Sequence, residues 1–161
     1  MFLPSELNLI MQLNWPTQRA VDWHPFHLEM IELNEFDAEN EDLFMDYAKY
    51  ISSFSTKGMA FTIMEEKIFA CFGIFKLWQG VYEAWLIPSA DISTRKFRLH
   101  KASKLFFDHA MQKLDMRRLQ VTVCSRHRLA VKWAEVCYFS HEGVLRNYGP
   151  QGDDYYIMSR I

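Results

Sequence analysis

The sequence has no long apolar run, almost no net charge and few cysteines. No stretch approaches the roughly 20 apolar residues that a membrane-spanning helix requires, and the first residues lack the basic cluster of a signal peptide. The formal net charge of −2 gives no overall field that would attract nucleic acid or an anionic membrane. Cys71, Cys124 and Cys137 form no CxxC pair. We therefore expect a cytoplasmic protein with reduced thiols and neither a membrane partner nor a nucleic-acid partner.

Motifs that would identify several other catalytic classes are also missing. The sequence contains no Walker A loop, no nucleophile elbow and no internal repeat. His24 and His27, with Asp22, form the nearest approach to a metal-ligand group, but no second group follows at a recognisable spacing. Cys124 precedes His127 by three residues, a proximity that is common by chance. The sequence predicts no metal site and gives little support for a cysteine nucleophile.

What the chain does have is sufficient length and a large apolar content. Half of its 161 residues are apolar and 16% are aromatic. A chain of this length can build a core without disulfides or metals, and the aromatic content argues against disorder. No Pro-, Gly- or Ser-rich linker divides it. We expect one domain over residues 1–161.

The first third of the sequence gives the weakest structural signals. Residues 1–22 are predicted to form an irregular lead, because Pro4 and Pro16 would break any regular element. Residues 26–33 alternate in polarity in a way that predicts a short strand. Asp37 is the expected cap of a helix that continues to about Ile51.

The remaining two thirds alternate clearly between strand and helix patterns. Strands are predicted over residues 59–66, 67–77, 81–88, 118–123, 143–149 and 154–161, and helices over residues 93–114 and 127–139. Phe97 is expected on the buried face of the first of these helices, and Leu129 on that of the second. Helices between strands indicate crossovers, so the order predicts an α/β (α+β) fold with a mixed sheet in three layers.

This order resembles the GNAT superfamily of N-acetyltransferases, most clearly over residues 58–161. Leu86–Pro88 resembles the family's hydrophobic-x-Pro strand end, and residues 95–100 stand where the family has an Arg/Gln-x-x-Gly-x-Gly/Ala loop. Residues 127–139 stand where it has an Asn-x-x-Ala-x-x-Leu-Tyr helix, followed here by Glu142-Gly143. The resemblance implies a mostly antiparallel sheet of six to seven strands. It also implies transfer of acetyl from acetyl-CoA to a primary amine of a protein or small molecule.

A narrower similarity lies within the first long helix. The run TRKFRLHKASKLFFDHAM, residues 94–111, is similar to a helix of small GNAT-like internal virion proteins of short-tailed bacteriophages. This similarity implies a location in the host cytoplasm or the virion, with virion or host proteins as partners. It leaves open a second interpretation, in which the chain is a non-catalytic GNAT-like module.

The cofactor loop departs from the family pattern. Arg95 matches its first position, but Arg98 and His100 stand where the family has glycines, and Lys96 adds another cation. Glycines allow backbone N–H groups to approach a pyrophosphate closely, whereas arginine binds phosphate through its side chain. These four side chains are the candidate phosphate ligands of acetyl-CoA or CoA. A contact with nucleic acid or protein and a solvated helical turn are the alternatives.

Three further positions follow from the resemblance for the cofactor. The backbone of Leu86 and Ile87 would bind the pantetheine arm and supply an oxyanion donor. His127, at the start of the later helix, is a further candidate cofactor ligand.

Glu83 and Tyr138 are the candidate catalytic residues. A carboxylate within the apolar strand VYEAWLIP is unusual, because burial of a charged group is unfavourable, and this makes Glu83 a candidate for a function. Many family members use a glutamate on this strand to accept the proton of the amine. The alternative is that the period of two turns Glu83 towards solvent. Ala134 occupies the position of the family's thiolate-protonating tyrosine, so Tyr138 is the candidate substitute, with His127 and Cys124 as others.

Overall fold

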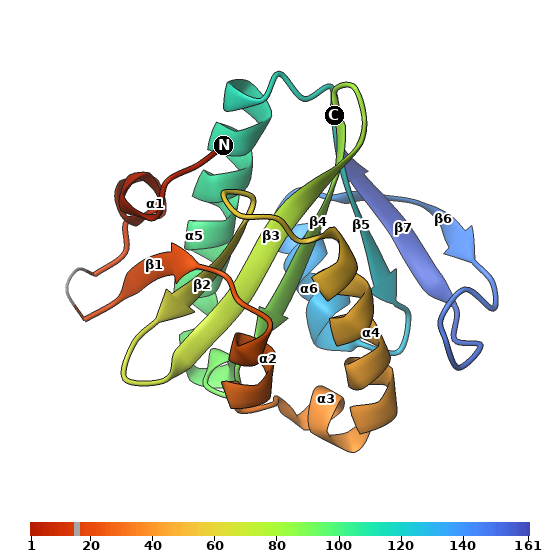
Figure 1. Cartoon of the computed structure of the whole chain (residues 1–161). Coiled ribbons are helices and arrows are strands. Elements are labelled where there is room, and N and C mark those ends of the chain that lie inside the picture. Colours follow the sequence, from red (N-terminus) through yellow and green to blue (C-terminus); the bar gives the residue numbers. More distant parts are fainter. Residues whose placement is uncertain (15–16) are drawn as a thin grey trace.

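A seven-stranded sheet with helices on both faces forms the centre of the molecule (Figure 1). The computed structural model describes residues 1–14 and 17–161. The strand order across the sheet is β1-β2-β3-β4-β5-β7-β6. β4 and β5 run parallel, and every other neighbouring pair of the described sheet is antiparallel. The predicted three-layer fold with a mixed, mostly antiparallel sheet is confirmed.

The elements follow one another in the order predicted for most of the chain. The strands are β1 (Arg19–Asp22), β2 (Ala60–Met64), β3 (Ile68–Trp78), β4 (Val81–Pro88), β5 (Arg118–Cys124), β6 (Ser140–Leu145) and β7 (Tyr155–Arg160). The helices are α1 (Pro4–Ile10), α2 (Phe26–Met30), α3 (Glu35–Glu39), α4 (Glu41–Phe54), α5 (Ile92–Lys113) and α6 (Arg128–Val136). None of the helices described is both long and apolar enough to cross a bilayer.

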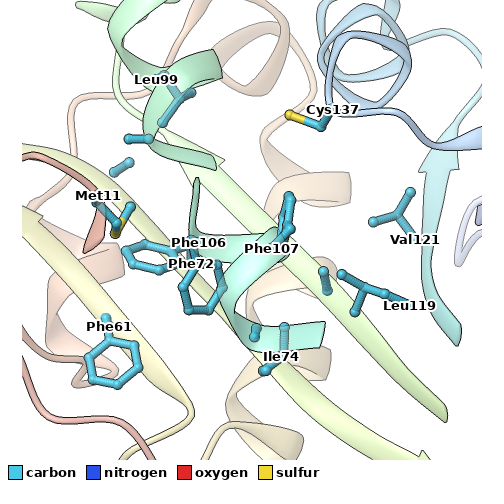
Figure 2. Packing of buried hydrophobic residues seen from close by; sticks show 14 of the residues in the cluster. Met11, Phe61, Phe72, Ile74, Leu99, Phe106, Phe107, Leu119, Val121 and Cys137 are labelled. Atoms are coloured by element: carbon cyan, nitrogen blue, oxygen red, sulfur yellow. The ribbon is translucent and has the colours of Figure 1, made fainter. Parts of the chain in front are cut away.

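Two hydrophobic clusters cover the two faces of the sheet. α1, α5 and α6 contribute to the larger cluster, and α2 and α4 contribute to the smaller one; Figure 1 shows α4 in front of the sheet and α5 and α6 behind it. In the larger cluster, Phe106 of α5 meets Phe72 of β3 edge to face at 5.1 Å between ring centroids (Figure 2). Aromatic pairs of this kind add to the stabilisation from burial. They fix α5 against the middle of the sheet.

The strands β2, β3 and β4 form the antiparallel meander that their apolar runs predicted. Seven of the eight residues of β4 pair with β3 in an unbroken register from Ala70↔Pro88 to Lys76↔Tyr82. The predicted turn after Trp78 is present, and Gly80 within it has a φ of +72°. Only glycine adopts this conformation without strain. The meander therefore places Glu83 in the middle of the sheet.

The prediction that residues 1–22 form an irregular lead is wrong. They contain helix α1 and strand β1, and β1 pairs antiparallel with β2. Pro4 occupies the first turn of α1, where the N–H that proline lacks would have had no partner. The Asn8 side chain accepts a hydrogen bond from the Ala20 N–H at 2.8 Å and joins the helix to the strand. The break predicted at Pro16 lies outside the described residues.

The strand predicted over residues 26–33 is also wrong, since this segment begins with helix α2. The eight residues with alternating polarity are too short a run to separate a strand from a helical turn. Only Leu28 of α2 is buried, while Phe26 and Met30 are exposed. The predicted helix cap at Asp37 is replaced by Asn34, whose side chain accepts the Asp37 N–H at 3.2 Å and so caps α3.

The predicted buried positions Phe97 and Leu129 are exposed, at 77% and 62%. Both lie in the first turn of a helical segment, where the helix extends past the core. Strand β6 also begins three residues earlier than predicted. The predicted turn at residues 149–152 is present, with the Gly152 N–H donating to the Gly149 carbonyl at 2.9 Å.

Candidate active site

The parallel strands β4 and β5 diverge after a short contact. They share three register pairs, which are Val81↔Arg118, Tyr82↔Leu119 and Glu83↔Gln120. Beyond these pairs β4 continues to Pro88 and β5 to Cys124 without pairing with each other. Backbone groups of a strand require hydrogen-bond partners. The second half of β4, which includes Leu86 and Ile87, therefore has an edge towards β5 that can bind a ligand.

A cleft of about 420 Å³ lies at this divergence, within the range of pockets that bind small molecules. It is bounded by the ends of β4 and β5, by α3 and α4 on one face, and by α5 and α6 on the other. The predicted cofactor-site residues that line it are Leu86, Ile87, Lys96, His100 and His127. The structure therefore brings five of the seven together.

The basic segment at the start of α5 is divided by a kink. Arg95 has φ −125° and ψ 21°, so the regular helix begins after it. Lys96 and His100, one helical turn apart, line the cleft. The Arg95 guanidinium pairs with Glu65 and with Asp91, the latter at 3.1 Å. These ion pairs hold the Arg95 side chain away from the cleft, and Arg95 is not among the residues that line it.

Arg98 also lies outside the cleft. It lines a separate pocket of about 210 Å³ beside residues 11–14 and Lys101. No glycine occurs between Gly80 and Gly143. A phosphate at the start of α5 would therefore meet side chains rather than a backbone made bare by glycines.

Glu83 is buried within the sheet, and the alternative that it faces solvent is wrong. Its side chain is on the face covered by α4, with 7% of the residue exposed. One carboxylate oxygen accepts from the Thr122 hydroxyl at 2.8 Å, and the other from the Gln120 amide at 3.3 Å. Burial raises the pKa of Glu83, while these two hydrogen bonds act to lower it. Thr122 lines the cleft, so the carboxylate lies one hydrogen bond from it.

Four tyrosines that the sequence analysis did not single out lie in or near the cleft, and three of them are close enough to Glu83 to feel its charge. Tyr47 and Tyr155 line the cleft. Burial raises the pKa of Tyr47, Tyr50 and Tyr148, and the negative charge of Glu83 raises each of them further. The spacing of Tyr47 and Tyr50 on a predicted helix was a usable signal. Their meeting with Tyr148 and Tyr155 depends on the strand order and had no signal in the sequence.

His127 joins the two sides of the cleft. Its Nδ1 accepts the Ala130 N–H at 3.4 Å and caps α6. Its ring stacks on Phe36 of α3 with 4.1 Å between centroids, and its Nε2 lies 3.8 Å from an Asp37 oxygen, beyond hydrogen-bond length. Burial lowers the pKa of His127 to about 4. The imidazole is therefore neutral at pH 7 and can donate a hydrogen bond but brings no charge.

Tyr138 lies outside the lining of the cleft. It follows α6 with a φ of +67° and is 64% exposed. The Lys104 ammonium lies over its ring at 4.6 Å. Ala134, at the position where the resemblance puts a tyrosine, is fully buried. The phenols that do line the cleft come from α4 and β7 instead.

The histidines weighed as metal ligands have other partners. The His27 Nδ1 lies 2.7 Å from the Thr62 hydroxyl, and His24 stacks on Phe26 with 5.1 Å between centroids. Across residues 1–14 and 17–161, no three His, Cys, Asp or Glu side chains gather as a metal site would require.

Comparison with known proteins identifies the fold but no sequence relative. No family model and no curated protein matches the sequence. A GNAT-family acetyltransferase from Bacillus anthracis superposes with a TM-score of 0.68 at 11% identity, covering 92% of this chain and 97% of that one.

Two further structures match over almost the whole chain. The ribosomal-protein-S5-alanine acetyltransferase from Vibrio fischeri has a TM-score of 0.63 at 11% identity, covering 92% of this chain and 95% of its own. RimL, a ribosomal L7/L12 alpha-N-protein acetyltransferase in complex with coenzyme A, has a TM-score of 0.63 at 10% identity, covering 91% and 94%. The chain has the fold of the GNAT acetyltransferases.

Proposed function

We propose that the protein is an N-acetyltransferase that moves an acetyl group from acetyl-CoA to a primary amine of a protein or small molecule. The observation that carries this proposal is the position of Glu83, a buried carboxylate at the point where β4 and β5 diverge. A buried carboxylate with a raised pKa beside a cleft is a typical general base. The likeness of the fold to acetyltransferases supports the same activity.

The residues of the cleft fit acetyl-CoA. The unpaired edge of β4 at Leu86 and Ile87 offers backbone groups to the amides of the pantetheine arm. Lys96 and His100 stand in the first two turns of the regular part of α5, where the helix dipole favours phosphate. His127 offers a hydrogen bond from its neutral ring. Side chains would thus bind the phosphates of acetyl-CoA, which glycines and backbone N–H groups bind in the cofactor loop of the GNAT family.

The chemistry requires little beyond these groups. Acetyl-CoA supplies an activated acyl group. Glu83 accepts one proton from the ammonium of the acceptor, directly or through water, and the freed lone pair bonds to the acetyl carbon. The carbon–sulfur bond breaks as the thiolate leaves, and the second amine proton is lost to the thiolate or to solvent. Backbone N–H groups near Leu86 would stabilise the oxyanion.

The absence of a tyrosine at position 134 should lower the rate of acetyl transfer but does not prevent the reaction. A thiol has a pKa of about 8.5, so its thiolate can leave without a dedicated acid. Tyr138, outside the cleft lining, would have to move to serve as that acid. We expect Tyr138→Phe to leave most of the transfer rate intact; a loss of 100-fold would assign the acid role to it.

Calorimetric titration with acetyl-CoA, and with CoA as a second ligand, tests the proposal. We expect binding that weakens in Lys96→Ala and in His100→Ala. Lys101→Ala is the matched control, because Lys101 is exposed on the same helix and lies outside the cleft. Absence of binding to the wild-type protein would refute the cofactor site and with it the proposed activity.

A second candidate function is a non-catalytic module with the same fold. Arg98 and His100 in place of loop glycines and the buried Ala134 favour it. Its partners would be virion or host proteins, as the narrow similarity of residues 94–111 implies. A melting temperature that excess acetyl-CoA leaves unchanged would support it, because a ligand of the native state raises that temperature.

A further inference from the structure

The segments that bound the cleft on its two sides differ in the sign of the charges in their sequences. Residues 35–54, which form α3 and α4, contain six acidic side chains and one basic one. Residues 92–107 of α5 contain five lysines and arginines and no acid. α3 and α4 lie on one face of the sheet and α5 on the other (Figure 1). Of these charged side chains, Asp37 lines the cleft from α3 and Lys96 lines it from α5, so a positively charged reactant is favoured on the α3–α4 side and a negatively charged one on the α5 side.

Aromatic rings lie on the acidic side, around Glu83. Phe75 is the cross-strand neighbour of Glu83, and the ring of Tyr50 meets Phe75 edge to face with 6.3 Å between centroids. Tyr47 lies one turn before Tyr50, 6.4 Å away. Tyr148, in the loop between β6 and β7, contacts Tyr155, which lines the cleft, at 5.5 Å. Aromatic faces therefore come from α4, β3, β7 and the β6–β7 loop.

No cation of the described chain occupies this site. Glu83 forms no ion pair within the described ranges, and its hydrogen-bond partners Thr122 and Gln120 are neutral. The nearest linked cation, Arg118, bonds Gln120 but has its charge matched by Glu142 at 2.6 Å.

The tyrosine faces are likewise free of cations. Seven cation–π contacts occur in the described structure, and none of them involves these four tyrosines. Tyr138, by contrast, already has Lys104 over its ring. The carboxylate of Glu83 and these four tyrosines thus form a site to which the described part of the chain contributes no cationic side chain.

We propose that this place binds the acceptor and that the acceptor is a primary ammonium on a flexible aliphatic chain. The inference rests on the proposed function and specifies its substrate. The ammonium would lie against the faces of Tyr47 and Tyr155 and hydrogen-bond to Glu83, while Tyr50 and Tyr148, both partly exposed, guide the aliphatic chain. An amine that carries a carboxylate beside its nitrogen is disfavoured, because a second negative charge would face Glu83 and the acidic α3–α4 segment.

Two sources supply such an ammonium, a small polyamine and the lysine side chain of a protein. The assay uses spermidine for the first and Nα-acetyl-lysine methylamide for the second, with glutamate as the anionic amine. Release of the CoA thiol is measured at a fixed saturating concentration of acetyl-CoA. We expect transfer to one or both alkylamines at least tenfold above glutamate, and the preferred one identifies the source.

Variants at the exposed tyrosines make the test specific. Tyr50→Leu and Tyr148→Leu should each raise the KM for the alkylamine severalfold while calorimetry shows unchanged acetyl-CoA binding. Phe26→Leu, an exposed aromatic on α2, is the control and should change neither. Equal effects of all three variants, or a preference for glutamate, would overturn the inference.

The failure of this inference is separable from the failure of the proposed function. Spermidine and Nα-acetyl-lysine methylamide are also titrated without acetyl-CoA, with binding read from the heat and from the tyrosine fluorescence. If acetyl-CoA binds and neither alkylamine binds or reacts, the acceptor inference is wrong and the activity stands. If acetyl-CoA does not bind but an alkylamine binds in a Tyr50-dependent way, the activity is wrong and the cation site stands.

Discussion

The α5 side and the α4 side of the cleft differ in almost every chemical property. The α5 side has Lys96 and His100 at a helix start, and no carboxylate in its first four turns. The α4 side has six carboxylates on a short segment, four tyrosines and the buried Glu83. A symmetric or merely apolar cleft would serve one kind of ligand. The difference matches the proposed function, in which the ammonium of the acceptor and the phosphates of acetyl-CoA carry opposite charge.

The largest expected effect comes from removing the carboxylate on the α4 side. Glu83→Gln keeps the shape and one acceptor for Thr122 but cannot take a proton. We expect the transfer rate to fall by about 100-fold or more, with acetyl-CoA binding unchanged by calorimetry. Glu135→Gln, which alters an exposed carboxylate of α6 outside the lining of the cleft, is the control. A Glu83→Gln variant with normal turnover would leave the α4 side without a base.

The raised pKa of Glu83 has consequences of defined sign. Activity requires the ionised form, so the acid limb of kcat/KM should lie above the ordinary glutamate range near 4.3, and Glu83→Gln should lack it. A carboxylate with a raised folded-state pKa contributes stability below its unfolded pKa and loses it as pH rises through the folded pKa. At pH 7 the melting temperature of Glu83→Gln, measured by thermal denaturation, should therefore be at least as high as that of the wild type.

The next largest effect concerns the α5 side. Lys96→Ala should weaken acetyl-CoA binding by about tenfold, the size of one lost charge-assisted hydrogen bond, and should leave alkylamine binding unchanged. Titrations with both ligands measure the two sides separately. If Lys96→Ala weakened both ligands equally, the division of the cleft into two sides would be lost.

A smaller effect is expected at His127, which connects the sides. His127→Ala removes the α6 cap and the stacking on Phe36, at a cost of about 1–2 kcal/mol in unfolding free energy. His127→Asn should recover the part due to the cap, and Arg128→Ala serves as the control. The lowered pKa means that the wild type loses stability as pH falls from about 6.5 towards about 4. A denaturant titration at several pH values measures this, and a flat difference between wild type and His127→Ala would contradict it.

The smallest effect should come from the surface charge of the α4 side. Asp42→Asn removes an exposed carboxylate and should raise the alkylamine KM about twofold at low salt. High salt should abolish the difference, because exposed charges are screened. Glu29→Gln, exposed on α2, should have no effect. An effect of Asp42→Asn that persists at high salt would point to direct contact rather than to the field.

The sequence predicted the parts of this molecule that depend on long local patterns. The meander from β2 to β4 has apolar runs that leave one interpretation, and Glu83 was identifiable because a carboxylate inside such a run is unusual. Residues 26–33, which contain α2, were too short a run for their pattern to distinguish a helix from a strand. Pro4 was misassigned because proline breaks a helix only beyond its first turn.

The composition of the site was harder to predict than its individual members. Arg95, Lys96, Arg98 and His100 form one basic run in the sequence, and the kink at Arg95 together with the pitch of the helix sends only two of them to the cleft. The four tyrosines form two pairs, Tyr47 with Tyr50 and Tyr148 with Tyr155, which are more than 90 residues apart in the chain. Only the placement of β7 beside β5 brings the two pairs together. Topology, rather than local pattern, decides both outcomes.

The brief contact of β4 with β5 also affects how the molecule holds together. β1 to β4 form one continuous ladder and β5 to β7 another, and three residue pairs join them. A ligand that filled the space between the diverging strands would contact both half-sheets and connect them. Occupancy of the cleft should then increase the cooperativity of unfolding. In hydrogen exchange, the amide hydrogens of the two half-sheets should exchange as one unit when the ligand is bound and as two units when it is absent.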